Sequence, residues 1–162
     1  MTDVKRGFEP VYNSESKVLI LGSFPSVKSR KICFYYGNKQ NRFWKTLCGF
    51  FGDSIPETVD GKREYLLEHS VALWDVVSEC EIEGSQDTKI KNFKVADINS
   101  LLQNSNIRYI IINGNKAYSI FEKYFLSDAH VPVEKLSSTS PANTRFNEKE
   151  WHDALSRAFG RA

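Results

Sequence analysis

One pattern recurs along the chain: a short apolar run stops at small or polar residues, and apolar residues at helical spacing follow. The clearest example is "KVLILGSFPS", in which Val18 to Leu21 predict a buried strand and Gly22 to Ser26 the turn that leaves it. Strands that alternate with helices predict a parallel sheet covered by helices on both faces. The other expected strands are "VALWDVV", "IRYIIING" and "VPVEKLSS", and the expected helices cover 43–51, 61–69, a segment from Asp97, 115–125 and 148–160.

The length and composition are those of one folded unit. The chain has 162 residues, of which 41% are hydrophobic, and no repeat, low-complexity tract or linker divides it. We therefore expect a single domain over residues 1–162. Lysine and arginine total 22 against 20 acidic residues, so the formal net charge of +2 does not indicate a particular charged partner.

The residues present disfavour several classes of protein. Cys33, Cys48 and Cys80 show no CxxC spacing, and the start "MTDVKRGFEP" has no secretory leader, so we expect a reduced, cytoplasmic environment. The longest apolar run is well short of the ~18 residues that predict a membrane span, so we expect no membrane. The three histidines are scattered singly, and we therefore expect no metal.

The predicted sheet also indicates where a ligand binds. In open parallel sheets, ligands bind outside the carboxyl ends of the strands. The segments that leave the expected strands are rich in Ser, Asn, Thr and Gly, whose hydroxyl, amide and backbone N–H groups suit phosphate oxygens and base edges. We expect all four to face one crevice: "GSFPS" at 22–26, the polar run after Trp74, "NGNKA" at 113–117 and "SSTSPAN" at 137–143.

Familiar nucleotide-binding and nucleophile motifs are missing from these segments. "NGNKA" lacks both the GxGxxG spacing of a dinucleotide site and the GKS or GKT of a phosphate loop. No Ser or Cys sits in a nucleophile elbow, and no His lies within the polar segments. Taken alone, "GSFPS" is compatible with any turn, and Asp75 with a solvated strand end as well as with a functional role.

The stretch "FYYGNKQNRFW", residues 34–44, is more informative. Burial in a helix explains Phe43 and Trp44, but not Tyr35, Tyr36 or the amides that follow them. Two interpretations remain open from the residues themselves. The stretch is either a surface that stacks on bases and binds their edges, or a loop whose aromatic side chains pack into the core.

Taken together and in this order, five segments resemble the hypoxanthine-DNA glycosylase (DNA-deoxyinosine glycosylase) branch of the uracil-DNA glycosylase superfamily. They are "LILGSFPS", "FYYGNKQNRFW", "ALWDVVSECEIEGSQD", "NGNKA" and "STSPAN". The resemblance runs from about Phe8 to Trp151. It implies a three-layer α/β/α sandwich around a short, mainly parallel four-stranded sheet, and cleavage of the N-glycosidic bond of a deaminated base.

The resemblance also implies roles for individual residues. "GSFP" stands where mismatch-specific relatives have Gly-Ile-Asn-Pro, so Ser23 replaces their catalytic Asn, and the water-positioning role falls to Asn41 of the Asn-x-Phe-Trp element. Tyr36 takes the place of the ring that stacks on the flipped base, and Asp75 that of a side chain reading the base edge. The pocket set is completed by Gly22, Phe24, Pro25 and Asn113.

The "STSPAN" loop corresponds to a motif that enters the minor groove and grips phosphates. Two departures from the family pattern concern base preference and loop rigidity: Asn38-Lys39 replaces His-Pro, and Leu-Ser-Ser replaces Leu-Pro-Ser before Thr139. The expected DNA-binding residues are Ser138, Thr139, Ser140, Pro141, Ala142 and Asn143, together with Lys28 and Arg30.

The expected activity is that of a monofunctional DNA glycosylase, without strand cleavage, because no lysine is clearly placed for a Schiff base. An amide such as Asn41 does not ionise, so we expect the rate to depend little on pH near neutrality. We expect no cofactor, a monomer, double-stranded DNA with a deaminated base as partner, and a cytoplasmic, nucleoid-associated location. The alternatives are a uracil or G:U/G:T mismatch-specific glycosylase and a lesion-binding or nucleotide-binding module that does not cut.

Overall fold

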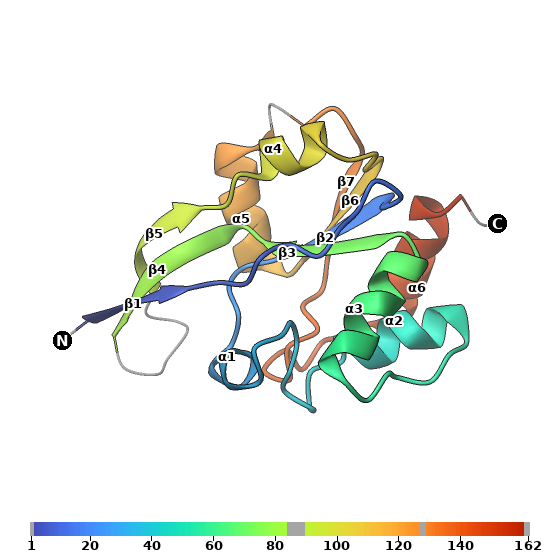
Figure 1. Cartoon of the computed structure of the whole chain (residues 1–162), viewed down its shortest axis with the longest axis horizontal. Coiled ribbons are helices and arrows are strands. Elements are labelled where there is room, and N and C mark those ends of the chain that lie inside the picture. The colour runs from blue at the N-terminus through green and yellow to red at the C-terminus, as the bar shows by residue number, and fades with distance from the viewer. Residues whose placement is uncertain (1, 84–89, 127–128, 161–162) are drawn as a thin grey trace.

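A four-stranded, fully parallel sheet lies at the centre of the protein, in the order β3-β2-β6-β7 (Figure 1). The computed structural model describes residues 2–83, 90–126 and 129–160. Largely apolar runs form β2, β3 and β6, as the sequence predicts, and every residue of β2 is buried, whereas the edge strand β7 contains two charged residues. The strands are β2 (Val18–Gly22), β3 (Val71–Asp75), β6 (Tyr109–Asn113) and β7 (Val133–Leu136).

Helices cover both faces of this sheet. Side chains alternate between the faces of a strand, so Val18 and Ile20 pack with the α2, α3 and α6 side, whereas Leu19 and Leu21 pack with the α4 and α5 side. The prediction of a three-layer α/β/α sandwich is therefore confirmed (Figure 1). The helices are α1 (Val27–Ile32), α2 (Phe43–Phe51), α3 (Val59–Glu68), α4 (Ile98–Gln103), α5 (Asn115–Tyr124) and α6 (Glu148–Ala158).

Several helix boundaries follow from capping groups in the sequence. The side chain of Asp97 accepts a hydrogen bond from the Ser100 N–H at 3.1 Å, which confirms the helix start predicted there. Gly52 ends α2 with a φ of +79°, a left-handed conformation that glycine adopts at little cost. Ser26 caps α1, a short helix that we did not predict.

A second, antiparallel sheet was also not predicted. It has the order β1-β4-β5 and comprises β1 (Thr2–Arg6), β4 (Val77–Glu83) and β5 (Ile90–Val95). The run "VALWDVV", predicted as one strand, is split between the two sheets at Val76. These strands contain charged residues in place of a continuous apolar run, and the charges pair across the sheet: Glu79 contacts Lys94 at 3.0 Å and Arg6 at 3.6 Å.

The register of the parallel sheet brings the strand ends together. Gly22 lies opposite Asp75, Leu21 opposite Ile112, and Asn113 opposite Leu136. The ends of all four strands therefore lie at one edge of the sheet, as expected. The polar run after Trp74 was wrongly expected to be a segment facing the crevice, because its residues Val77–Glu83 form β4 of the second sheet. Among the described residues, no helix is long and apolar enough to cross a membrane, and no cluster of three or more His, Cys, Asp or Glu side chains is arranged to hold a metal ion.

Candidate functional site

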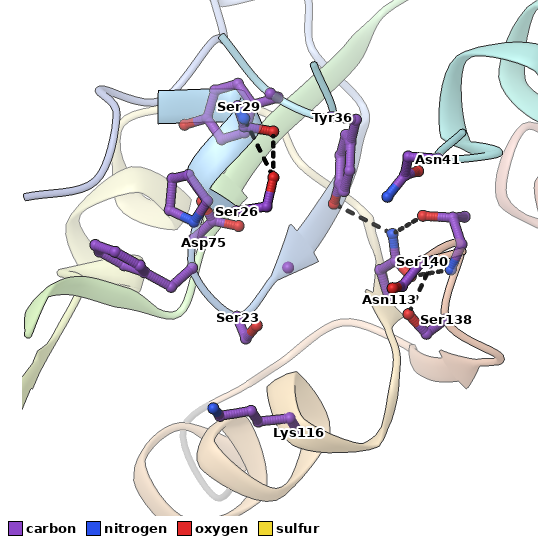
Figure 2. Close-up of a pocket in the computed structure, with 15 residues that line it drawn as sticks. Ser23, Ser26, Ser29, Tyr36, Asn41, Asp75, Asn113, Lys116, Ser138 and Ser140 are labelled. Carbon is purple, nitrogen blue, oxygen red and sulfur yellow. Dashed lines mark hydrogen bonds between the residues drawn. The ribbon is translucent and has the colours of Figure 1, made fainter. Parts of the chain in front are cut away.

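The strand-end turns enclose a cavity of about 250 Å³ together with the segment that precedes α2 (Figure 2). It lies at the carboxyl edge of the sheet, and five separate stretches of chain contribute to it. Its lining residues are Gly22, Ser23, Phe24, Pro25, Ser26, Ser29, Tyr35, Tyr36, Asn41, Asp75, Asn113, Lys116, Ser138, Thr139 and Ser140.

Gly22 makes room for the polar groups of this cavity. A Cβ atom at this position would lie 2.6 Å from Oδ1 of Asp75 and 2.9 Å from Oη of Tyr36, which is closer than such atoms approach. Any larger residue at the end of β2 would therefore displace the carboxyl group or the phenol. The glycine of "GSFP" is thus explained by close approach of neighbouring side chains.

Tyr36 forms one wall of the cavity and is held firmly. Its backbone has a φ of +54°, which is uncommon for a residue with a large side chain. The ring stacks on Phe43 at 4.2 Å between centroids with 22° between planes, and the Ser29 hydroxyl accepts a 2.9 Å hydrogen bond from the next N–H, that of Gly37. Burial raises the pKa of the Tyr36 phenol, and the nearby Asp75 adds to that effect, so the phenol stays protonated.

Asn113 joins the tyrosine wall to the loop after β7. Its amide nitrogen donates to Tyr36 Oη at 3.2 Å and to Thr139 Oγ1 at 3.0 Å, and its amide oxygen accepts from the Thr139 N–H at 3.0 Å. Both N–H donors of the side chain are therefore engaged. Asn113 and Thr139 are 8% and 1% exposed, so these bonds fix the shape of the cavity.

Asn41 enters the cavity from the segment before α2. Its side-chain oxygen accepts a hydrogen bond from the Phe43 N–H at 2.9 Å, and its own N–H donates to the Asn38 carbonyl at 2.9 Å. These two bonds orient the amide group. Figure 2 shows its nitrogen directed toward the space between Tyr36 and Asn113. One lone pair of its oxygen and both amide hydrogens remain for a ligand or a water molecule.

The turn after β2 lines the same cavity. The carbonyl groups of Gly22 and Ser23 accept bonds from Val76 and Val77 at 2.8 and 3.1 Å, which fixes the turn. Within the described part of the chain, the N–H groups of Ser23 and Phe24 donate to no acceptor. Adjacent backbone N–H groups that converge on a cavity can stabilise negative charge.

Arg42 was not predicted as a site residue, yet it ties Asn41's segment to the loop after β7. Its N–H donates to the Thr139 carbonyl at 3.0 Å, and its guanidinium donates to the carbonyls of Asn143 at 2.8 Å and Ser140 at 3.3 Å. The guanidinium carbon also lies 4.8 Å from the centre of the Phe146 ring. The positive charge of Arg42 within "NRFW" is the one feature of the sequence that indicates this contact with the loop.

Asp75 differs from the other buried polar residues of the cavity. Its side chain is 4% exposed, and among the described residues its Oδ2 atom is buried without a hydrogen-bond partner. Burial raises the pKa of this carboxyl to about 7, from an ordinary value of 3.8. The carboxyl at the end of this core strand is thus buried, and one of its oxygens has no partner among the described residues, so Asp75 does not lie at a solvated strand end.

The structure brings together the residues expected to act on the base. Every predicted catalytic and pocket residue lines the cavity, and so do Ser138, Thr139 and Ser140 of the loop. The buried Thr139 side chain contacts Asn113, so it holds the loop from inside. Of the other lining residues, Ser26 and Lys116 belong to strand-end segments that were expected to face the crevice, and Tyr35 belongs to the aromatic stretch 34–44, whereas Ser29 was not predicted.

The other expected DNA-binding residues lie outside the cavity. Pro141 and Ala142 are exposed on the loop, beside the partly exposed Asn143. Arg30 lies over the Phe24 ring at 5.7 Å. Lys28 lines a neighbouring groove that also contains Lys31 and Lys39.

Comparison with known proteins identifies the family. Two curated relatives, each named hypoxanthine DNA glycosylase, come from Methanosarcina acetivorans (35% identity, 91% of this chain and 96% of the relative) and Methanosarcina barkeri (30% identity, 94% and 99%). The solution NMR structure of a candidate uracil DNA glycosylase from M. acetivorans superposes with a TM-score of 0.84 at 33% identity, covering 97% of this chain and 99% of that one. Residues 9–158 match the Uracil DNA glycosylase superfamily. The chain therefore belongs to the uracil DNA glycosylase superfamily.

Proposed function

We propose that the protein is a monofunctional DNA glycosylase that flips out a deaminated base, principally hypoxanthine, and hydrolyses its N-glycosidic bond. The observation that carries this proposal is the single cavity in which Asn41, Tyr36 and Asp75 meet, in a chain whose relatives bear the name hypoxanthine DNA glycosylase. Double-stranded DNA is the corresponding partner. The monomeric state and the nucleoid-associated location stay predictions.

The cavity suits one flat base. Its volume of about 250 Å³ is just below the range of about 300–1,000 Å³ that drug-sized ligands occupy. Extruding a nucleotide costs about a few kcal/mol, least for a mismatched or damaged base. Stacking on an aromatic ring contributes about 1–3 kcal/mol, so the Tyr36 wall offsets much of that cost. Phe43 supports this ring from behind and keeps it from turning aside.

Asn41 is the group that positions the attacking water. As the C1'–N bond breaks, positive charge develops on the sugar and negative charge on the base. The free lone pair of the Asn41 oxygen can accept a hydrogen bond from the water, whereas an amide is too weak a base to remove its proton. The water is therefore activated by the sugar cation, and Asn41 supplies orientation. Ser23 contributes its backbone N–H to the departing base, in the manner of an oxyanion hole.

The loop after β7 holds the DNA backbone beside the lesion. Ser138 and Ser140 line the cavity, and their hydroxyls accept hydrogen bonds from the Ser140 and Ala142 N–H groups at 3.1 and 3.2 Å, which leaves the hydroxyl hydrogens for a phosphate. Pro141 and Ala142 form the exposed tip. Arg42 fixes this loop relative to Asn41, so a phosphate bound by the loop places the sugar near the water.

The test is a nicking assay on matched duplexes. Duplexes that carry hypoxanthine, uracil, xanthine or only normal bases are incubated with the protein and then treated with alkali, which breaks the strand at an abasic site. The proposal predicts nicks at hypoxanthine that require the alkali. Preferential cutting of uracil would favour the mismatch-specific alternative, and binding without cutting of any duplex would favour a non-catalytic module.

Two variants sharpen the assay. Asn41→Ala removes the water-positioning amide and should slow cutting at least about 10²-fold. Asn104→Ala is the matched control, because Asn104 is exposed at the end of α4 and its side chain donates only to the Ser100 carbonyl. An Asn41→Ala protein that cuts at the wild-type rate would refute the assignment of Asn41.

A further inference from the structure

The polar groups of the cavity are not equally available to a base. Asn113 already uses both amide hydrogens, and Thr139 is bound to it through its hydroxyl and its N–H. Ser29 accepts hydrogen bonds from Gly37 and Ser26 at 2.9 and 3.1 Å. Among the described buried polar side chains of the cavity, Asp75 is therefore the one with a buried oxygen, Oδ2, that has no hydrogen-bond partner.

The surroundings of Asp75 favour its protonated form. A buried carboxylate without a partner loses its hydration and gains no compensating bond, which is costly. Besides Asp75, the ionisable side chains that line the cavity are Tyr35, Tyr36 and Lys116, and β2 faces Asp75 with the side-chain-free Gly22. The pKa of both phenols is raised by burial and then by Asp75, so both are neutral. Burial alone raises the pKa of Asp75 to about 7.

The geometry points to Asp75 as the general acid of this site: its carboxyl proton passes to a ring nitrogen of the departing base as the C1'–N bond breaks. This inference rests on the proposed function and adds a catalytic step to it. The electron pair of the broken bond goes to the base, which leaves neutral after taking the proton. Water adds to C1' and releases one proton, and one proton from solvent restores the Asp75 carboxyl.

Stacking and water positioning do not protonate the departing base, and a proton donor in the cavity would do so. A purine anion is a poor leaving group, and protonation in the transition state contributes typically 10²- to 10⁴-fold to the rate. A general acid works best when its pKa lies near the operating pH, which holds for a carboxyl at about 7. Asn41 alone would give the flat pH profile that we expected from the sequence. A titrating Asp75 gives a profile that falls at alkaline pH.

The experiment is a pH profile of the single-turnover cleavage rate on a hypoxanthine duplex, with saturating protein, from pH 5 to 8.5. The wild type should show a level rate at low pH and a fall that begins near pH 7 and approaches about tenfold per pH unit above pH 8. Asp75→Asn should be at least about 10²-fold slower at pH 6 and should lack the fall. Asp153→Asn, which changes an exposed aspartate on α6, should reproduce the wild-type profile.

Each outcome decides the matter. A level wild-type rate across the range overturns the inference, whether or not the variant folds. Full activity of Asp75→Asn at pH 6, or an unchanged alkaline fall in that variant, also overturns it while leaving the glycosylase proposal intact. A wild-type protein that cuts no deaminated base at any of these pH values overturns the proposed function and the inference together.

Discussion

Replacing Asp75 with asparagine should stabilise the protein, and increasingly so as the pH rises. The folded protein holds the Asp75 proton with a pKa of about 7, against an ordinary value of 3.8. Between these values the unfolded chain has lost the proton and the folded protein retains it, so the free energy of unfolding falls with rising pH. The two pKa values differ by about three units, and each unit changes the free energy of unfolding by about 1.4 kcal/mol, so the full loss of stability is on the order of 4 kcal/mol.

The assay is urea unfolding followed by tryptophan fluorescence, for the wild type and Asp75→Asn, from pH 4.5 to 8.5. Trp44 and Trp151 are buried and report the loss of the core. The variant should have nearly wild-type stability near pH 4.5 and exceed it by a few kcal/mol above pH 7.5. Asp153→Asn is the control, since Lys149 lowers the pKa of that exposed carboxyl and the pair should show no trend in this range. A constant difference between Asp75→Asn and wild type would refute the assignment of a buried, protonated carboxyl.

Three further predictions concern the cavity and its rim. Gly22→Ala should retain DNA binding in a gel-shift assay but lose at least about 10²-fold in cutting rate, because the added methyl displaces the Asp75 carboxyl; undiminished cutting would contradict this. Arg42→Lys removes the guanidinium bonds to the Ser140 and Asn143 carbonyls, so loop 138–143 should become more sensitive to limited proteolysis and cutting should slow about tenfold. An unchanged proteolysis pattern would count against the role of Arg42 in holding this loop. Lys28→Gln should reduce the magnitude of the slope of log DNA affinity against log salt concentration by about 0.9, the value for one phosphate. An unaltered slope would show that Lys28 does not contact the DNA backbone.

The parallel sheet was predictable because the runs that form β2, β3 and β6 are largely apolar, although the edge strand β7 contains Glu134 and Lys135. Val18 to Leu21 are buried on both faces, so their composition alone indicates a central strand. The second sheet was missed because its strands lack such runs: β4 carries Glu79 and Glu81, and β5 carries Lys94. Strand pairing there depends on cross-strand charges, and a single sequence does not reveal which charged residues will face each other.

The location of the site was predictable, but the state of its side chains was not. The carboxyl-end rule and the motif resemblance placed Ser23 and Asn41 in one crevice. Asn113 donates its amide hydrogens to Tyr36 and Thr139 because the loop after β7, 26 residues further along the chain, packs against it. The isolation of Asp75 likewise depends on its register with Gly22, a contact between strands far apart in the sequence.

The most direct test of the account is chromatographic detection of the free base. A hypoxanthine duplex and an otherwise identical guanine duplex are incubated with excess wild-type protein or Asn41→Ala, without alkali. The wild type should release hypoxanthine stoichiometrically, the variant should release it slowly, and neither should release guanine. Equal release of hypoxanthine by both proteins would contradict the assignment of Asn41, and no release by either would contradict the claim that this cavity cuts the glycosidic bond.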